Sequence, residues 1–93
     1  MKQIPPDCVA YKQTSLFTET TIPAGLLKSH KTKAGVWGKI VVTEGRLMYR
    51  ILEPVLETHE LTRAQAGVVE PTVLHEVAPL GPVKFHVEFF SRA

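Results

Sequence analysis

The chain has 93 residues, of which 44% are hydrophobic and 22% charged, and this composition is that of one globular domain rather than a disordered or membrane-embedded chain. Eleven basic residues against nine acidic ones are too evenly balanced for a nucleic-acid-binding surface, which argues against that class of partner. Met1–Pro6 contains no apolar signal segment, and no stretch approaches the length of a membrane helix, so we expect a single domain over residues 1–93 and no membrane partner.

Cys8 is the single cysteine, so the chain can form no internal disulfide, and a reducing, cytoplasmic location is expected. The one local excess of charge consists of four lysines: Lys28, Lys31, Lys33 and Lys39. Lysines in such numbers are typical of a solvated loop or an exposed face, and attraction of a small anion is the alternative.

Seven prolines and six glycines are spread along the whole chain, which favours short strands over helices. The segment Cys8–Phe17 predicts one outer strand, followed by a turn at Pro23-Ala24-Gly25. Lys39–Thr43 and Arg46–Leu52 are rich in β-branched, aromatic and aliphatic residues, so each is predicted to be a strand. Glu44-Gly45 between them predicts a tight hairpin turn.

The second half of the chain predicts further strands. Glu53–Arg63 has a composition that fits a helical turn as well as an edge strand. Val73–Val77 and Val83–Phe90 are predicted to be strands, separated by two prolines and a glycine. In total we expect roughly seven or eight strands, the number found in a small antiparallel sandwich or barrel.

The last predicted strand has two different faces. Because side chains alternate along a strand, Phe85 and Val87 point one way while His86 and Glu88 point the other. The apolar face is expected to lie in the core. The face with the histidine and the carboxylate fits either a half-exposed outer surface or the lining of a polar barrel interior.

Histidines are the residues on which a functional site could be built, because no phosphate loop, paired-cysteine motif, nucleophile elbow or HExxH pattern is present. His30 lies in a loop or strand start, where a solvated side chain is the alternative to a ligand. His75 heads a strand, and a histidine that caps a turn is its alternative. His86 and Glu88 could complete a metal site or make a surface contact, whereas His59 is interpreted as exposed.

A set of segments in fixed order resembles a known family: Ile22–Leu27, His30–Ile40, Glu44-Gly45, Val69–Pro71, His75–Val77 and Phe85–Phe90. The combination is similar to the small domain found at the N-terminus of some tellurite-resistance TehB proteins, which also occurs alone in bacterial proteins of the YeaR type. The resemblance covers nearly the whole chain, from about Pro23 to Phe90.

This resemblance implies an all-β fold, a cupin-like double-stranded β-helix, which is a small antiparallel jelly-roll barrel. In cupins, a first motif with a histidine precedes a glycine-turned hairpin, and a second motif places a proline shortly before another histidine. His30 with Gly45 is similar to the first motif, and Gly67, Pro71 and His75 are similar to the second.

The resemblance also implies a set of metal ligands. His30 and His75 are the expected pair, with Glu88 or His86 as the third ligand. Such a site would suit zinc, iron, manganese or nickel. The second histidine and the glutamate of the first cupin motif have no match over Thr32–Gly38.

Three functions remain open from the sequence. The first is a stand-alone stress-response domain, related to tellurite-resistance proteins, that binds a divalent metal or a small oxyanion inside the barrel. The second is a metal-dependent oxygenase or isomerase acting on a small polar molecule. The third is a non-catalytic interaction module, expected to form a homodimer through an exposed strand edge. No glycine-rich cofactor loop is present, so neither a nucleotide cofactor nor methyl transfer is assigned.

Overall fold

Two long antiparallel strands, β3 and β6, dominate the computed structural model, which describes all of residues 1–93. The elements in chain order are β1 (Cys8–Gln13), β2 (Phe17–Thr18), the 3-10 helix η1 (Ala24–Leu27), β3 (Trp37–Ile51), β4 (Glu57–Leu61), β5 (Gly67–Val69) and β6 (His75–Arg92). The chain is therefore all-β, as predicted. Its one helical element is a single short turn, and no helix is long and apolar enough to span a membrane.

The pairing of β3 with β6 organises the sheet. It runs from Trp37 opposite Phe90 to Ile51 opposite His75, and so spans the full length of β3. The other strands add to the free sides of this pair: β1 and β2 along β6, and β4 and β5 along β3. All of these pairings are antiparallel, and all except that of β3 with the adjacent β4 join segments that lie far apart in the sequence.

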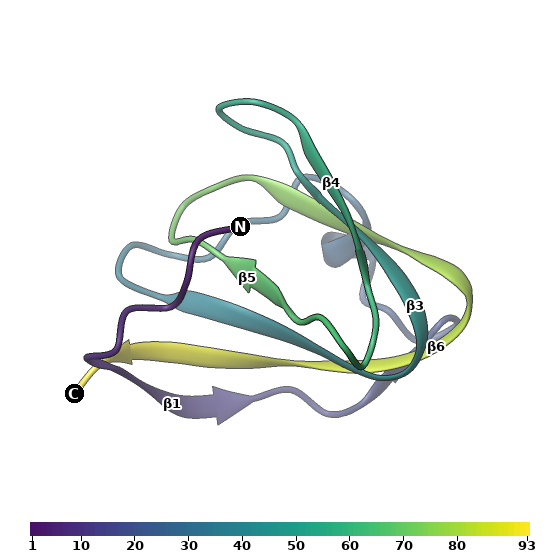
Figure 1. Ribbon diagram of the computed structural model, residues 1–93, viewed down its shortest axis with the longest axis horizontal. Helices are drawn as coiled ribbons and strands as arrows, with labels where there is room; N and C mark the ends of the chain where they lie inside the picture. Colours follow the sequence, from purple (N-terminus) through teal and green to yellow (C-terminus); the bar gives the residue numbers. More distant parts are fainter.

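Both long strands bend in the middle. The register of the pair shifts between Val42 and Glu44 and again between Gly45 and Leu47. Gly45 adopts a φ of +77°, which a residue with a side chain rarely takes, and such positions are typical of β-bulges. Figure 1 shows both strands turning sharply at one side, so that the two arms of the sheet face each other.

The predicted hairpin at Glu44-Gly45 is wrong. Lys39–Thr43 and Arg46–Leu52 belong almost entirely to the single strand β3, and Val73–Val77 and Val83–Phe90 largely to the single strand β6. A bulge with a glycine at positive φ bends a strand without reversing it, and β6 pairs with both halves of β3. The sheet consequently has six strands rather than seven or eight.

The less distinctive segments follow their predictions more closely. Cys8–Phe17 supplies the outer strand β1 and the first residue of β2. Within Glu53–Arg63, the edge-strand alternative is confirmed, because β4 pairs only with β3. The turn expected at Pro23-Ala24-Gly25 is the entry to η1.

The core lies between the two arms of the bent sheet. It comprises ten buried hydrophobic side chains: Ile40, Val42, Leu47, Tyr49, Leu61, Val69, Val77, Val83, Phe85 and Val87. Burying each of the larger ones contributes about 1.5–3 kcal/mol to folding. The predicted core face of the last strand is confirmed, because Phe85 is 0% and Val87 7% exposed.

The bend generates a testable prediction at Gly45. A Cβ added there would clash with the carbonyl oxygen of Pro82, and the residue would have to adopt a left-handed backbone conformation. We expect Gly45→Ala to lower the free energy of unfolding by at least about 2 kcal/mol, since the left-handed conformation alone costs about 1–2 kcal/mol. Gly25→Ala is the matched control, because a Cβ at Gly25 meets nothing within 4 Å. Urea denaturation of both variants measures the difference, and equal midpoints would contradict the proposed importance of the bulge.

Candidate functional site

Two histidines from distant parts of the chain lie side by side at one end of the core. The backbone N–H of His30 donates to the carbonyl of His75 at 2.7 Å, and the N–H of His75 donates to the carbonyl of His30 at 2.8 Å. This reciprocal pair is an isolated antiparallel bridge beside the first residue of β6. Their rings meet edge to face, with centroids 5.4 Å apart. The pair expected from the sequence is thus brought together.

His75 is held in one orientation. Its side chain is buried, at 3% exposure, and Nδ1 lies 3.2 Å from the carbonyl oxygen of Val73. A carbonyl can only accept a hydrogen bond, so Nδ1 carries the proton and Nε2 keeps its lone pair. Burial lowers the pKa of His75 below its ordinary value of 6.5, opposed by the Val73 hydrogen bond and reinforced by His30. The imidazole is therefore neutral near pH 7.

A cavity of about 230 Å³ adjoins the two rings. It is lined by Thr14, Phe17, Pro23, Leu26, His30, Thr32, Gly38, Ile40, Val69, His75, Val77, Phe85, Val87 and Phe89. The segment before β2, the helix η1 and the loop between η1 and β3 form part of the wall, and the remainder comes mainly from the strands of the two arms. The predicted pair therefore contributes two polar groups to a wall that is otherwise mostly apolar.

His30 also borders a shallower cleft on the surface. That cleft is lined by Tyr11, Lys12, His30, Thr32, Lys33, Val36 and Phe89. Two of the residues that share it with His30 are lysines, and both are exposed. The His30 ring thus forms part of both the cavity and a positively charged cleft, so it can meet a ligand from either side.

His86 and Glu88 lie elsewhere. Nε2 of His86 is 2.9 Å from a carboxylate oxygen of Glu88, and the two side chains are 17% and 26% exposed. They point away from Phe85 and Val87, which line the cavity, because side chains alternate along β6. The half-exposed outer surface, one of the two alternatives for this face, is the one observed.

The four predicted ligands therefore do not form one cluster. No group of three or more His, Cys, Asp or Glu side chains is arranged so that it could hold a metal ion. His30 and His75 are neighbours, whereas His86 and Glu88 pair with each other on the opposite face of β6. The alternation of the strand separates them, because only odd-numbered residues of this part of β6 point into the core.

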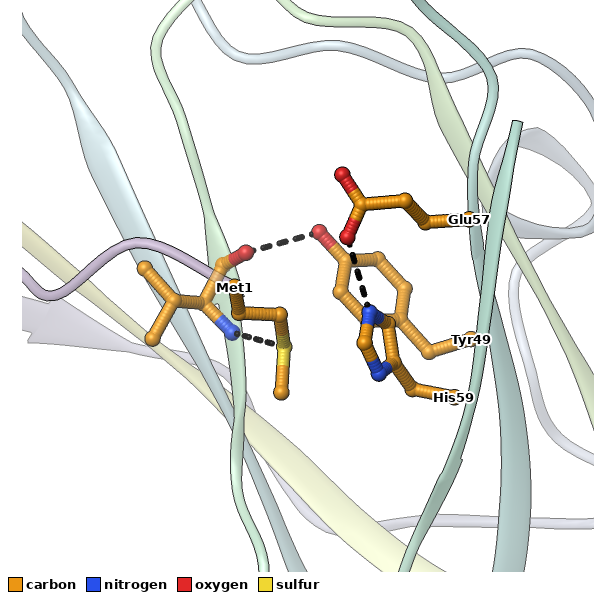
Figure 2. A network of polar contacts seen from close by, with 5 residues as sticks. Met1, Tyr49, Glu57 and His59 are labelled. Carbon is orange, nitrogen blue, oxygen red and sulfur yellow. Dashed lines mark hydrogen bonds and ion pairs between the residues drawn. The ribbon is translucent and has the colours of Figure 1, made fainter. Parts of the chain in front are cut away.

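Tyr49 packs against the ring of His75. Its ring is 1% exposed and lies 5.9 Å from the His75 ring, again edge to face. Its hydroxyl donates to the carbonyl of Val68 at 2.8 Å, and Nε2 of His59 lies 3.1 Å from a carboxylate oxygen of Glu57. Figure 2 shows Tyr49 beside this contact of His59 with Glu57. The His59 side chain is only 23% exposed, so its interpretation as an exposed residue is wrong. The reason is its position opposite Tyr49 in the β3–β4 pair.

Tyr49 is a site residue that the sequence pattern did not predict. Burial raises the pKa of its hydroxyl well above the ordinary value of 10.0, and the negative charges of Glu70 and Glu57 raise it further. The hydroxyl is therefore a permanent donor. A tyrosine within an apolar strand segment is a partial signal, because a buried tyrosine requires a hydrogen-bond partner. Phe17 and Leu26 also line the cavity, but no feature of the sequence marks them as site residues.

Comparison with known proteins identifies the family. The family model of the TehB-like domain matches residues 12–87. Two curated relatives, from Haemophilus influenzae strains Rd and 10810, are each described as a probable S-adenosyl-L-methionine-dependent methyltransferase TehB. They are 33% and 32% identical over 78 residues, which make up 80% of this chain and 27% of each relative. The chain therefore spans about a quarter of the length of these relatives.

Two solved structures have the same fold. The crystal structure of TehB from Haemophilus influenzae matches with a TM-score of 0.85 at 27% identity, over 94% of this chain and 32% of that one. The crystal structure of a protein from Escherichia coli strain K12 matches with a TM-score of 0.89 at 22% identity, over 100% of this chain and 99% of that one, a likeness that shows the fold alone. The resemblance found in the sequence is confirmed, and the chain belongs to the TehB-like domain family.

Proposed function

We propose that this TehB-like domain is a binding module whose cavity takes a divalent metal ion at His30 and His75. The observation that carries the proposal is the His75 imidazole, which is neutral, fixed by Val73 and borders the cavity. A histidine that ligates a metal usually donates its other ring N–H to a carbonyl or a carboxylate, which is the arrangement of His75 and Val73.

Two imidazoles would fill two positions of a tetrahedral ion. The remaining positions would go to water or to a ligand, as in sites that bind a further molecule. Among the expected metals, imidazole nitrogen suits zinc, iron and nickel better than manganese, which prefers oxygen ligands. In this proposal His86 and Glu88 are not ligands, because they pair on the other face of β6.

A small oxyanion is the second candidate ligand. Lys12 and Lys33 share the outer cleft with His30, so an anion seated there would meet positive charge and an imidazole ring. An oxyanion is also the class of molecule that a relation to tellurite resistance suggests. The neutral, acceptor form of His75 favours the metal on the cavity side.

We propose binding and leave turnover to be tested. The TehB relatives are described as probable methyltransferases, but the chain spans only about a quarter of their length. A metal-dependent oxygenase or isomerase needs the same metal site first. We also propose that the fold is a cupin-like double-stranded β-helix. The bent strands β3 and β6, whose arms enclose the cavity, support this fold.

The proposed metal site predicts that metal binding requires His30 and His75 but not His86 and Glu88. We expect wild-type protein without a histidine tag to bind one zinc ion, and the His30→Ala/His75→Ala variant to bind at least about a hundredfold more weakly because it lacks both ligands. The matched control is His86→Ala/Glu88→Ala, which removes two potential metal ligands from the other face of β6. Elemental analysis and calorimetric titration with zinc, iron, manganese and nickel measure the effect. Retention of metal by the first variant, or its loss only in the second, would overturn this assignment.

The state of His75 predicts a pH dependence. Its pKa is lowered in the folded chain, so the unfolded chain binds the proton more tightly. The contribution of His75 to the free energy of unfolding is then fully present above its unfolded-state pKa of about 6.5 and declines as the pH falls below that value. Long-range ¹H–¹⁵N spectra should show the Nδ1–H tautomer of His75 at pH 7.5. A His75→Asn variant should lose part of the decline in urea midpoint between about pH 7 and pH 5. A titration of His75 above pH 6.5 in the folded protein would refute the prediction.

We also propose that two copies associate through the edge of β1. This strand pairs only with β6, and Val9 and Tyr11 are 48% and 52% exposed. Light scattering after gel filtration should therefore give about twice the chain mass of 10.3 kDa. Tyr11→Lys should shift the protein to monomer. Val55→Lys is the control, since Val55 is 71% exposed in the loop between β3 and β4. A wild-type monomer at millimolar concentration would exclude the dimer.

A further inference from the structure

We infer that the cavity beside His30 and His75 selects a small molecule with an apolar, ring-sized body and one polar head group, the head lying against the two imidazoles. The inference deepens the proposed function and rests on it for the head group, because the bound metal would be the partner of that head. The preference for an apolar body follows from the cavity alone, so this preference and the metal site can be refuted separately.

The polarity of the wall is the first argument. Nine of the fourteen lining residues are apolar: Phe17, Pro23, Leu26, Ile40, Val69, Val77, Phe85, Val87 and Phe89. The polar ones besides the histidines are Thr14 and Thr32, whose hydroxyls donate to the carbonyls of Ser15 and Val36 at 2.9 Å and 2.7 Å. The imidazoles are thus the groups of the wall most available to a polar ligand. A fully hydrated polar substrate would meet few partners elsewhere.

The size of the cavity is the second argument. An apolar cavity of about 150 Å³ holds a benzene molecule of six carbon atoms. In proportion, the volume of about 230 Å³ corresponds to a ligand of about nine non-hydrogen atoms. About nine non-hydrogen atoms make a six-membered ring with a carboxylate attached directly to it, and the cavity is too small for a nucleotide.

The aromatic residues of the wall suit such a body. Phe17 and Phe85 meet edge to face with ring centroids 5.5 Å apart, and Phe89 lines the same cavity. Aromatic rings contact other rings favourably at such distances. Phe85 is 0% exposed and sits in the paired part of β6, so it provides a fixed surface rather than an adaptable one.

Leu26 on η1 allows the cavity to be altered without touching the histidines. It lines the cavity, whereas its neighbour Leu27 is 39% exposed and does not. Leu26→Trp should fill part of the space, and Leu27→Trp adds the same side chain outside it. Leu26→Ala should enlarge the space, and it keeps the inference testable if the tryptophan variant fails to fold.

The experiment titrates three probes into metal-free and zinc-loaded protein, with methyl signals of Ile40 and Val77 in NMR spectra as the readout. The probes are benzene, benzoate and acetate. We expect saturable shifts with benzene in the metal-free wild-type protein. Zinc-loaded protein should bind benzoate at least about tenfold more tightly than acetate, because the ring adds buried apolar area.

The variants decide the location. Leu26→Trp should weaken benzene binding at least about tenfold while Leu27→Trp leaves it unchanged, and Leu26→Ala should bind the larger probe indole more tightly than wild type does. Failure of benzene to shift the cavity methyl signals, or equal affinity for acetate and benzoate, overturns the inference even if zinc binds. Benzene binding without any zinc binding supports the apolar body and refutes the metal site of the proposed function instead.

Discussion

The antiparallel pairing of β3 with β6 is the interaction on which the rest of the structure depends. Every other strand pairs with one of these two, so the sheet has no alternative centre. The pair connects residues as far apart as Trp37 and Phe90, and its closure orders most of the chain at once. Substitutions that weaken it therefore act on the core and on the cavity together. Edge elements such as β1 and β4 can vary with less effect, because each contacts a single neighbour.

The bend of that pair creates the site. A flat ladder would leave one face of Ile40 and Phe85 in water, whereas the bend lets the two arms cover each other. The same bend places the first residue of β6, His75, above the cavity opposite the arm that carries Phe85 and Val87. His30 then joins through backbone hydrogen bonds only. The backbone thus brings the two rings together, the Val73 carbonyl fixes the His75 ring through Nδ1, and Nε2 of His75 remains available for a ligand.

The all-β class, the core face of the last strand and the neighbouring histidines could be predicted because each depends on local pattern or on a specific family resemblance. The continuity of β3 could not be predicted from the sequence. Glu44-Gly45 has the composition of a turn, and only the presence of β6 along both halves decides that the chain bends rather than reverses. The place of His86 and Glu88 could not be predicted either, because strand alternation shows which residues share a face but not which face borders the cavity.

The cavity itself is the strongest structural argument for a ligand in this small domain. A chain of 93 residues has only ten side chains in its buried hydrophobic cluster, so unfilled space between the arms forgoes dispersion contacts that a larger residue would supply. The side chains that line the cavity, among them Leu26 and Val77, leave about 230 Å³ unfilled beside two imidazoles. An unfilled cavity beside the oriented lone pair of an imidazole is better explained by ligand binding than by core packing.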